Sequence, residues 1–131
     1  MSGETRANVD KQAGGSASQV FSFSDASLTA LVAHGGAGTV LADRVVDRVR
    51  ETPLHFVDLV EVAPGSTIGR HTHGDDEELY IVISGQAVVE LDGKKELIGP
   101  GDIAFNCSGG THALLVHGDD PLRMVVVCVR A

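Results

Sequence analysis

The chain has 131 residues, enough for one domain around a single hydrophobic core. Its 18 acidic residues outnumber its 10 basic ones, which gives a net charge of −8, and no cluster of Lys and Arg occurs. This charge balance argues against binding to nucleic acid, which requires basic side chains to neutralise phosphates, and no apolar run approaches the ~18 residues that a membrane span needs.

Residues 1–19 are mostly Ser, Gly, Ala and charged residues. Such a segment buries too little apolar surface to offset the entropy lost on ordering, so we expect a flexible tail there and one domain over residues 20–131. The tail contains no apolar run typical of a secretory signal, and neither Cys107 nor Cys128 lies in a CxxC pair. We therefore expect a cytoplasmic protein with two free thiols, rather than one with a disulfide.

The first part of the domain carries mixed signals. Residues 20–23 alternate apolar and polar side chains, as in a short strand, whereas residues 28–32 fit either a short helix or a strand. The glycine-rich residues 35–38 form a break, and a plain turn fits better than a phosphate-binding loop because no Gly-Lys-Ser/Thr follows. Residues 39–50 satisfy both helical and strand spacing, and their β-branched content favours a strand.

From residue 54 onward, strands and turns alternate at short and even intervals. Residues 54–62 form a long apolar-rich strand that ends at a Pro-Gly turn signal, and Asp92-Gly93 is a strong hairpin signal. Further strands are expected at residues 78–83, 87–91, 94–98, 103–105, 112–117 and 122–129. Evenly spaced short strands of this kind are typical of an all-β sandwich or barrel.

Four residues of this region have the chemistry of metal ligands. His71 and His73 are two residues apart, so in a strand their side chains share one face. A turn rich in Gly and Asp follows them, and Glu78 opens the next strand, where its carboxylate can return beside the histidines. His112 comes 34 residues later, after two glycines that allow a sharp bend. Neutral imidazoles with a carboxylate suit one divalent transition metal such as iron, manganese, nickel, zinc or copper.

The spacing of these residues resembles the first motif of the cupin family. That motif runs Gly, five residues, His-x-His, three or four residues, Glu, six residues and Gly, and it is matched here by Gly65, His71, His73, Glu78 and Gly85. Glu77 also fits the shorter gap, but only Glu78 leaves six residues before the last glycine. The resemblance therefore favours Glu78 as the carboxylate ligand.

The second cupin motif is partly present. Gly101, Gly109 and His112 occupy their expected positions, whereas Cys107 and Val116 replace the usual Pro and Asn. The resemblance covers residues 38–129. It implies an all-β fold, the double-stranded β-helix or jelly-roll barrel. It also implies a homodimer through sheet edges, to which the apolar segments at residues 20–23 and 28–32 can contribute.

Strand alternation predicts what surrounds the metal. Tyr80 and Val82 share the face of Glu78, while Leu114 and Val116 share the face of His112, which predicts a mostly apolar pocket with one phenol. Tyr80 is a catalytic candidate that can donate a proton or a hydrogen bond to a metal-bound ligand, or it only packs the barrel. His55 is a further catalytic candidate on the strand at residues 54–62, with a surface or core role as the alternative.

The resemblance and the apolar pocket together favour a metal-dependent enzyme for a small, fairly apolar, oxygenated metabolite such as a carboxylate, enol or diketone. Cupins with this ligand set include dioxygenases, isomerases, lyases and decarboxylases. Phosphorylated sugars fit less well, because a site for them needs several charged or amide groups. The alternative is a non-catalytic cupin that binds or senses a small molecule.

Overall fold

Two antiparallel sheets face each other in the computed structural model, which describes residues 18–31, 33–49 and 51–130. The predicted tail at residues 1–19 lies outside the described residues except for its last two positions. Within the described part, the elements are η1 (Phe23–Asp25), β1 (Thr29–Leu31), β2 (Val40–Arg44), η2 (Val45–Arg48), β3 (Leu54–Val62), β4 (Thr67–Thr72), β5 (Asp76–Ser84), β6 (Gln86–Leu91), β7 (Lys94–Ile98), β8 (Ile103–Asn106), β9 (Thr111–His117) and β10 (Leu122–Arg130).

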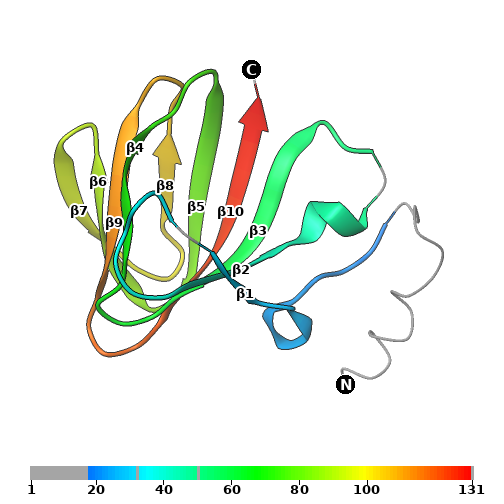
Figure 1. Cartoon of the computed structure of the whole chain (residues 1–131), viewed down its shortest axis with the longest axis horizontal. Helices are drawn as coiled ribbons and strands as arrows, with labels where there is room; N and C mark the ends of the chain where they lie inside the picture. The colour runs from blue at the N-terminus through cyan, green and yellow to red at the C-terminus, as the bar shows by residue number, and fades with distance from the viewer. Residues whose placement is uncertain (1–17, 32, 50, 131) are drawn as a thin grey trace.

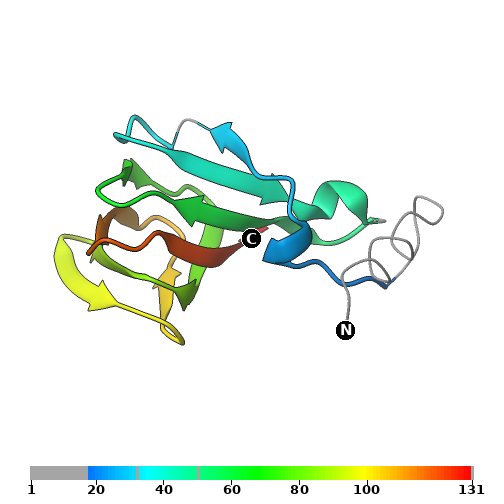
Figure 2. The ribbon, with the colours of Figure 1, turned by 90° about the horizontal axis from the view of Figure 1, so that it is seen from below.

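The larger sheet has the strand order β1-β2-β3-β10-β5-β8, and the smaller one has the order β4-β9-β6-β7. Figure 1 shows the smaller sheet on one side and β3, β10, β5 and β8 on the other, as in a jelly roll. The view from below separates the same two groups and shows η1 and η2 projecting away from β6 and β7 (Figure 2). The predicted all-β jelly-roll fold is confirmed, although the two sheets are not hydrogen-bonded into one closed barrel.

Alternation along the central strands fills the space between the sheets. In β10, Leu122, Met124, Val126 and Cys128 are buried, and the residues that alternate with them are more exposed. The same alternation in β5 buries Glu78 and Tyr80 on that inner face. The alternation of side chains along these strands therefore places the core residues and the site residues on the same face of the sheet.

Two glycine positions explain sharp changes of chain direction. Asp92 and Gly93 have φ values of 50° and 85°, which two-residue hairpins of the primed types require, and they join β6 to β7. Gly85 has φ +80°, and a Cβ atom on it would lie 2.3 Å from the carbonyl oxygen of Pro121. The last glycine of the first motif thus allows β5 to turn into β6 against the start of β10.

Two predictions for the N-terminal part need correction. Residues 20–23 do not form a strand; a 3₁₀ turn begins at Phe23, and the rings of Phe21 and Phe23 lie under the guanidinium groups of Arg48 and Arg123. The strand expected over residues 39–50 ends at Arg44 and continues as η2, whose Arg48 pairs with the buried carboxylate of Asp43. In both places, contacts distant in sequence outweigh local strand propensity.

The other N-terminal segments agree with one of their expected readings. The segment at residues 28–32 contains the short strand β1, and the glycine-rich residues 35–38 form turns and bends. Across the described ranges, no helix has the length and apolar character needed to cross a membrane.

Candidate metal site

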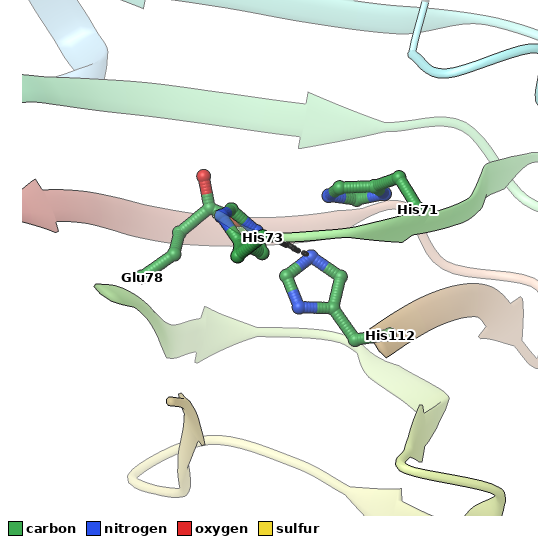
Figure 3. Close-up of side chains that lie close together, drawn as sticks. All are labelled: His71, His73, Glu78 and His112. Carbon is green, nitrogen blue, oxygen red and sulfur yellow. Dashed lines mark hydrogen bonds and ion pairs between the residues drawn. The ribbon is translucent and has the colours of Figure 1, made fainter. Parts of the chain in front are cut away.

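Strands of both sheets bring the four candidate ligands together. His71 lies in β4 opposite His112 of β9, while His73 follows directly after β4. Glu78 comes from β5 in the other sheet. Figure 3 shows the four side chains converging from these elements. The structure therefore assembles the complete predicted ligand set.

Backbone hydrogen bonds hold the two motif loops against each other. The amide of His73 donates to the carbonyl of Gly110 at 2.9 Å. In return, the carbonyl of Gly74 accepts hydrogen bonds from the amide of Gly109 at 3.0 Å and from the hydroxyl of Ser108 at 2.8 Å. These bonds fix the loop after β4 beside the loop before β9, which sets the distance between their histidines.

The ligand atoms of the four residues all lie within 4.8 Å of one another. Oε1 of Glu78 is 3.4 Å from Nε2 of His73 and 3.3 Å from Nε2 of His112, and the two imidazole nitrogens are 3.4 Å apart. Nitrogen and oxygen ligands lie about 2.0–2.2 Å from ions such as zinc, so ligands that share such an ion are about 3–3.5 Å apart. The spacing of these three atoms of His73, Glu78 and His112 fits a shared ion.

Hydrogen bonds outside the cluster fix the tautomers of two histidines. Nδ1 of His71 donates to the carbonyl of Gly69 at 2.8 Å, and Nδ1 of His73 donates to Oδ1 of Asp76 at 2.9 Å. In each ring the remaining nitrogen, Nε2, therefore carries a lone pair and points toward the cluster. Outer partners of this kind orient the histidine ligands of metal sites.

The cluster consists of hydrogen-bond acceptors that have too few donors. Nε2 of His71 is buried and has no hydrogen-bond partner. Nε2 of His73 and Oε1 of Glu78 are both acceptors and face each other at 3.4 Å. Buried acceptors without donors are unfavourable, and a cation at their centre would satisfy all of them. This donor set fits the divalent transition metal predicted from the sequence.

The protonation states also suit metal binding. Burial lowers the pKa of His71 to about 4, so its imidazole is neutral at physiological pH. Burial alone would raise the pKa of Glu78, but the hydrogen bond and charge of His112 and the charge of His73 outweigh it and lower the pKa. A neutral imidazole and an ionised carboxylate are the forms that bind metals.

A thiol completes the network behind His73. The carboxylate of Asp76 accepts the imidazole hydrogen with Oδ1, and its Oδ2 accepts the thiol hydrogen of Cys128 at 3.3 Å. Burial and the neighbouring carboxylate raise the pKa of Cys128 to about 12, so the thiol stays protonated and can keep donating. Cys107 is exposed, and both cysteines are free, as expected.

A cavity of about 120 Å³ opens beside Glu78 and Tyr80. The Tyr80 ring is buried, and its hydroxyl lies 3.1 Å from Nε2 of His112. Burial raises the pKa of Tyr80 well above its usual value, with a further contribution from the charge of Glu78, so the phenol keeps its proton. Tyr80 is thus a hydrogen-bond donor located between the cavity and the cluster.

The other site candidates lie in different surroundings. Val82, Leu114 and Val116 are buried, as strand alternation predicts, but they pack in the core cluster between the sheets, and none of them is among the residues that line the cavity beside Glu78. His55 is exposed in β3, where its Nε2 lies 3.2 Å from Arg130, and the structure does not bring it to the ligand cluster.

A histidine with no role in either motif lies against the cluster. The ring of His34 stacks on that of His71, with centroids 3.5 Å apart and planes inclined by 10°, and it lines the cavity. Its loop is packed closely on β4: a Cβ atom on Gly69 would lie 2.0 Å from the carbonyl oxygen of His34. The amide of Thr67 also donates to Ala37 at 2.8 Å. Within the glycine-rich residues 35–38, a Cβ atom on Gly36 would collide with the carbonyl oxygen of Thr67, so this glycine allows the loop to pack closely on β4.

An ion pair also lines the cavity. Nε and Nη2 of Arg44 each donate to the carboxylate of Asp58 at 2.9 Å, and the guanidinium lies 4.1 Å from the ring centroid of Phe56. All three residues line the cavity. Sequence patterns do not indicate this pair, because its members belong to separate strands. The pairing of Arg44 with Asp58 in the β2–β3 register is what joins them.

The fold and the cluster together define a jelly-roll protein with a candidate metal centre at the edge of an internal cavity. The model of the Cupin domain matches residues 58–128, a span that includes all four candidate ligands. The chain belongs to the cupin family.

Several known proteins are similar to this chain. An oxalate-binding protein of Thermotoga maritima is 28% identical over 97 residues, which cover 73% of this chain and 80% of that protein. The structure of a predicted oxalate decarboxylase from Thermotoga maritima has 23% identity and a TM-score of 0.77, covering 86% of this chain and 100% of the other. KdgF from Halomonas sp. has 20% identity and a TM-score of 0.67, covering 89% and 96%. The two structural matches support the fold alone.

Proposed function

We propose that this protein is a metal-dependent enzyme that acts on a small carboxylate or enol bound in the cavity beside Tyr80. The observation that carries the proposal is the buried set of acceptors formed by His71, His73, Glu78 and His112, which has too few donors of its own. One divalent first-row metal would be held by these side chains. When bound, it would supply a Lewis acid that polarises a substrate oxygen.

The protein's own groups have separate roles in this proposal. Glu78 and the histidines hold the metal, and the apolar walls of the cavity exclude water from the bound substrate. The neutral hydroxyl of Tyr80 donates a hydrogen bond to a substrate oxygen or returns a proton to it. His34 lies over His71 and limits access to that side of the cluster.

The substrate class is supported by chemistry and by similarity. Carboxylate and enolate oxygens are hard anionic ligands that suit a centre with nitrogen and oxygen ligands. One similar protein is named for binding oxalate, a carboxylate. With manganese, nickel or zinc, Lewis-acid chemistry of the isomerase, lyase or decarboxylase type fits the proposal, whereas iron would favour dioxygenase chemistry.

A non-catalytic binding protein is the second candidate. The observation in its favour is the small number of acid–base groups on the cavity: beside the ligand Glu78, the lining holds His34, Tyr80 and the Arg44–Asp58 pair. In addition, the relative from Thermotoga maritima is named for binding and not for a reaction.

Two measurements distinguish these functions. Elemental analysis of the protein as isolated is expected to find about one divalent metal per chain. Turnover of small carboxylates is then measured with the protein stripped and reloaded. Turnover that follows metal content supports the enzyme. Metal-dependent binding without turnover, under any of the five candidate metals, supports the binding protein, and absence of metal-dependent binding contradicts both.

The proposal also includes the oligomeric state, the location in the cell and the extent of the domain. We expect a homodimer in the cytoplasm, with residues 20–131 acting as one domain. Exposed apolar side chains at the β5–β8 edge, namely Ile83, Ile103 and Phe105, provide surface for association in addition to the N-terminal segments. Light scattering coupled to gel filtration tests this expectation, and a monomer at micromolar concentration would contradict it.

A further inference from the structure

The residues that line the cavity beside the metal cluster differ in exposure. The side chain of Arg44 is 49% exposed, Leu31 is 41% exposed, and His34 beside the cluster is also exposed. Tyr80, Met124 and Val126 are buried. A ligand that contacts both Glu78 and Arg44 within this cavity would place its middle against the apolar part of the lining.

Arg44 is held in place but keeps donors free. Its bonds to Asp58 use Nε–H and one N–H of Nη2, so the other edge of the guanidinium, which includes Nη1, is available. The ring of Phe56 supports the guanidinium plane at 4.1 Å. A planar cation that is fixed in this way loses little further entropy when it binds a carboxylate.

The ion pair contributes little that an apolar pair would not. Asp58 is 5% exposed, and burying a carboxylate costs free energy that its partner only partly returns. Because the guanidinium itself is half exposed, the attraction is also screened by solvent. The pair is thus poorly explained by stability, whereas a function that requires a preorganised cation at the cavity wall accounts for it.

We propose that Arg44 selects ligands with two acidic groups: one group reaches the metal cluster, and a carboxylate at the other end binds Arg44 across an apolar middle. The inference rests on the proposed binding of small carboxylates at the metal. It names the substrate class as a short dicarboxylic acid with an aliphatic spacer. Asp58 is a positioning residue that holds the guanidinium through Nε and Nη2, and its negative charge opposes that of the ligand carboxylate.

Calorimetric titration of the full chain tests the proposal. The protein is loaded with one equivalent of the metal found on isolation. It is titrated with malonate, succinate and glutarate and with the monocarboxylates of equal carbon number. The wild type is expected to bind at least one dicarboxylate about tenfold more tightly than its matched monocarboxylate, since a hydrogen bond to a charged group contributes about that much.

Two variants are expected to change the ratio of dicarboxylate affinity to monocarboxylate affinity in opposite directions. Arg44→Gln is expected to abolish the preference for the dicarboxylate while monocarboxylate affinity stays the same. Asp58→Asn removes the opposing negative charge while its side-chain oxygen can still accept a hydrogen bond from Arg44, and it is expected to tighten dicarboxylate binding severalfold. The double variant Arg44→Gln with Asp58→Asn leaves no unpaired buried charge, and it keeps the test valid if Arg44→Gln alone fails to fold.

The outcomes are distinguishable. If carboxylates bind in a metal-dependent way but the ratio is absent in the wild type or unchanged by Arg44→Gln and by the double variant, Arg44 does not select the ligand and this inference is overturned. If the ion pair is purely structural, Asp58→Asn will bind dicarboxylates no more tightly than the wild type does. If no carboxylate binds the metal-loaded wild type, the proposed function itself fails and the inference fails with it.

Discussion

The ligand cluster and the cavity wall contrast in how their polar groups are satisfied. In the cluster, buried acceptors such as Nε2 of His71 lack donors within the described residues, and a cation would satisfy them. At the cavity wall, Arg44 and Asp58 satisfy each other within the chain. The proposed metal would therefore supply at the cluster what the chain lacks there, whereas the ion pair is already satisfied and keeps one edge of the guanidinium available.

The largest expected effect is the loss of the metal. His112→Gln, or His71→Ala combined with His112→Ala, is expected to reduce metal content from about one ion per chain to nearly none, because ligands from two paired strands are removed. Mass spectrometry of the purified proteins measures it. His117→Gln in the same strand is the control, since this histidine is exposed. Retained metal in the double variant would show that the ligand assignment is wrong.

The next largest effect is expected from disturbing the close packing between β4 and the loop that carries His34. Gly69→Ala would place a Cβ atom 2.0 Å from the carbonyl oxygen of His34, so we expect a loss of about 1–3 kcal/mol in unfolding free energy. Chemical denaturation with and without metal measures it. Gly74→Ala is the matched control, because a Cβ atom there meets nothing within 4 Å. Equal stability of the two variants would contradict the close packing of the loop on β4.

A subtler change removes the charge behind His73. Asp76→Asn is expected to weaken metal affinity about 10–100-fold, because outer partners that orient a histidine ligand typically contribute that much. Competition with a chelator of known affinity measures the change. Asp75→Asn provides the control at the exposed neighbouring position. An unchanged affinity in Asp76→Asn would mean that the hydrogen bond to Nδ1 does not position the ring.

The smallest expected effect is the pH dependence of the unfolding free energy of the metal-free protein. The pKa of His71 falls from 6.5 in the unfolded chain to about 4 in the folded protein, so protons bind preferentially to the unfolded state. Stability from this group is complete above about pH 6.5 and is lost as the pH falls toward 4, on the order of 1–3 kcal/mol. Unfolding in urea at several pH values measures it, with His71→Gln as the reference. Identical pH profiles of the two proteins would refute the assignment.

Local signals were sufficient for one half of the molecule. The strands at Leu54–Val62 and Lys94–Ile98 were predicted with their observed bounds, because alternation and glycine turns depend on neighbouring residues only. The ligand set followed from its spacing, which is also local apart from His112. Strand parity likewise predicted that Tyr80 and Val82 face inward, and both are buried.

The contacts that the sequence did not predict depend on strand register and on loop packing, which residue spacing does not specify. Arg44 and Asp58 meet because β2 pairs with β3, and residues 39–50 gave no clear indication of where β2 ends. His34 reached the cluster because three glycines permit close packing between the loop and β4, a contact that requires knowledge of both partners. The sequence indicated Asp76 only as a turn residue. Its hydrogen bonds to His73 and Cys128 depend on the directions of the three side chains, which the sequence does not give.

The division of ligands between the sheets has a mechanical consequence. The three histidines come from β4, its end and β9 in the smaller sheet, and Glu78 alone comes from the larger one. An ion bound to all four would act as a cross-link between two layers that are otherwise joined by apolar packing and by polar contacts such as those of His73 with Asp76 and of Tyr80 with His112. Separation of the layers would then require the ion to lose at least one ligand, so bound metal would stabilise the packing of one sheet on the other.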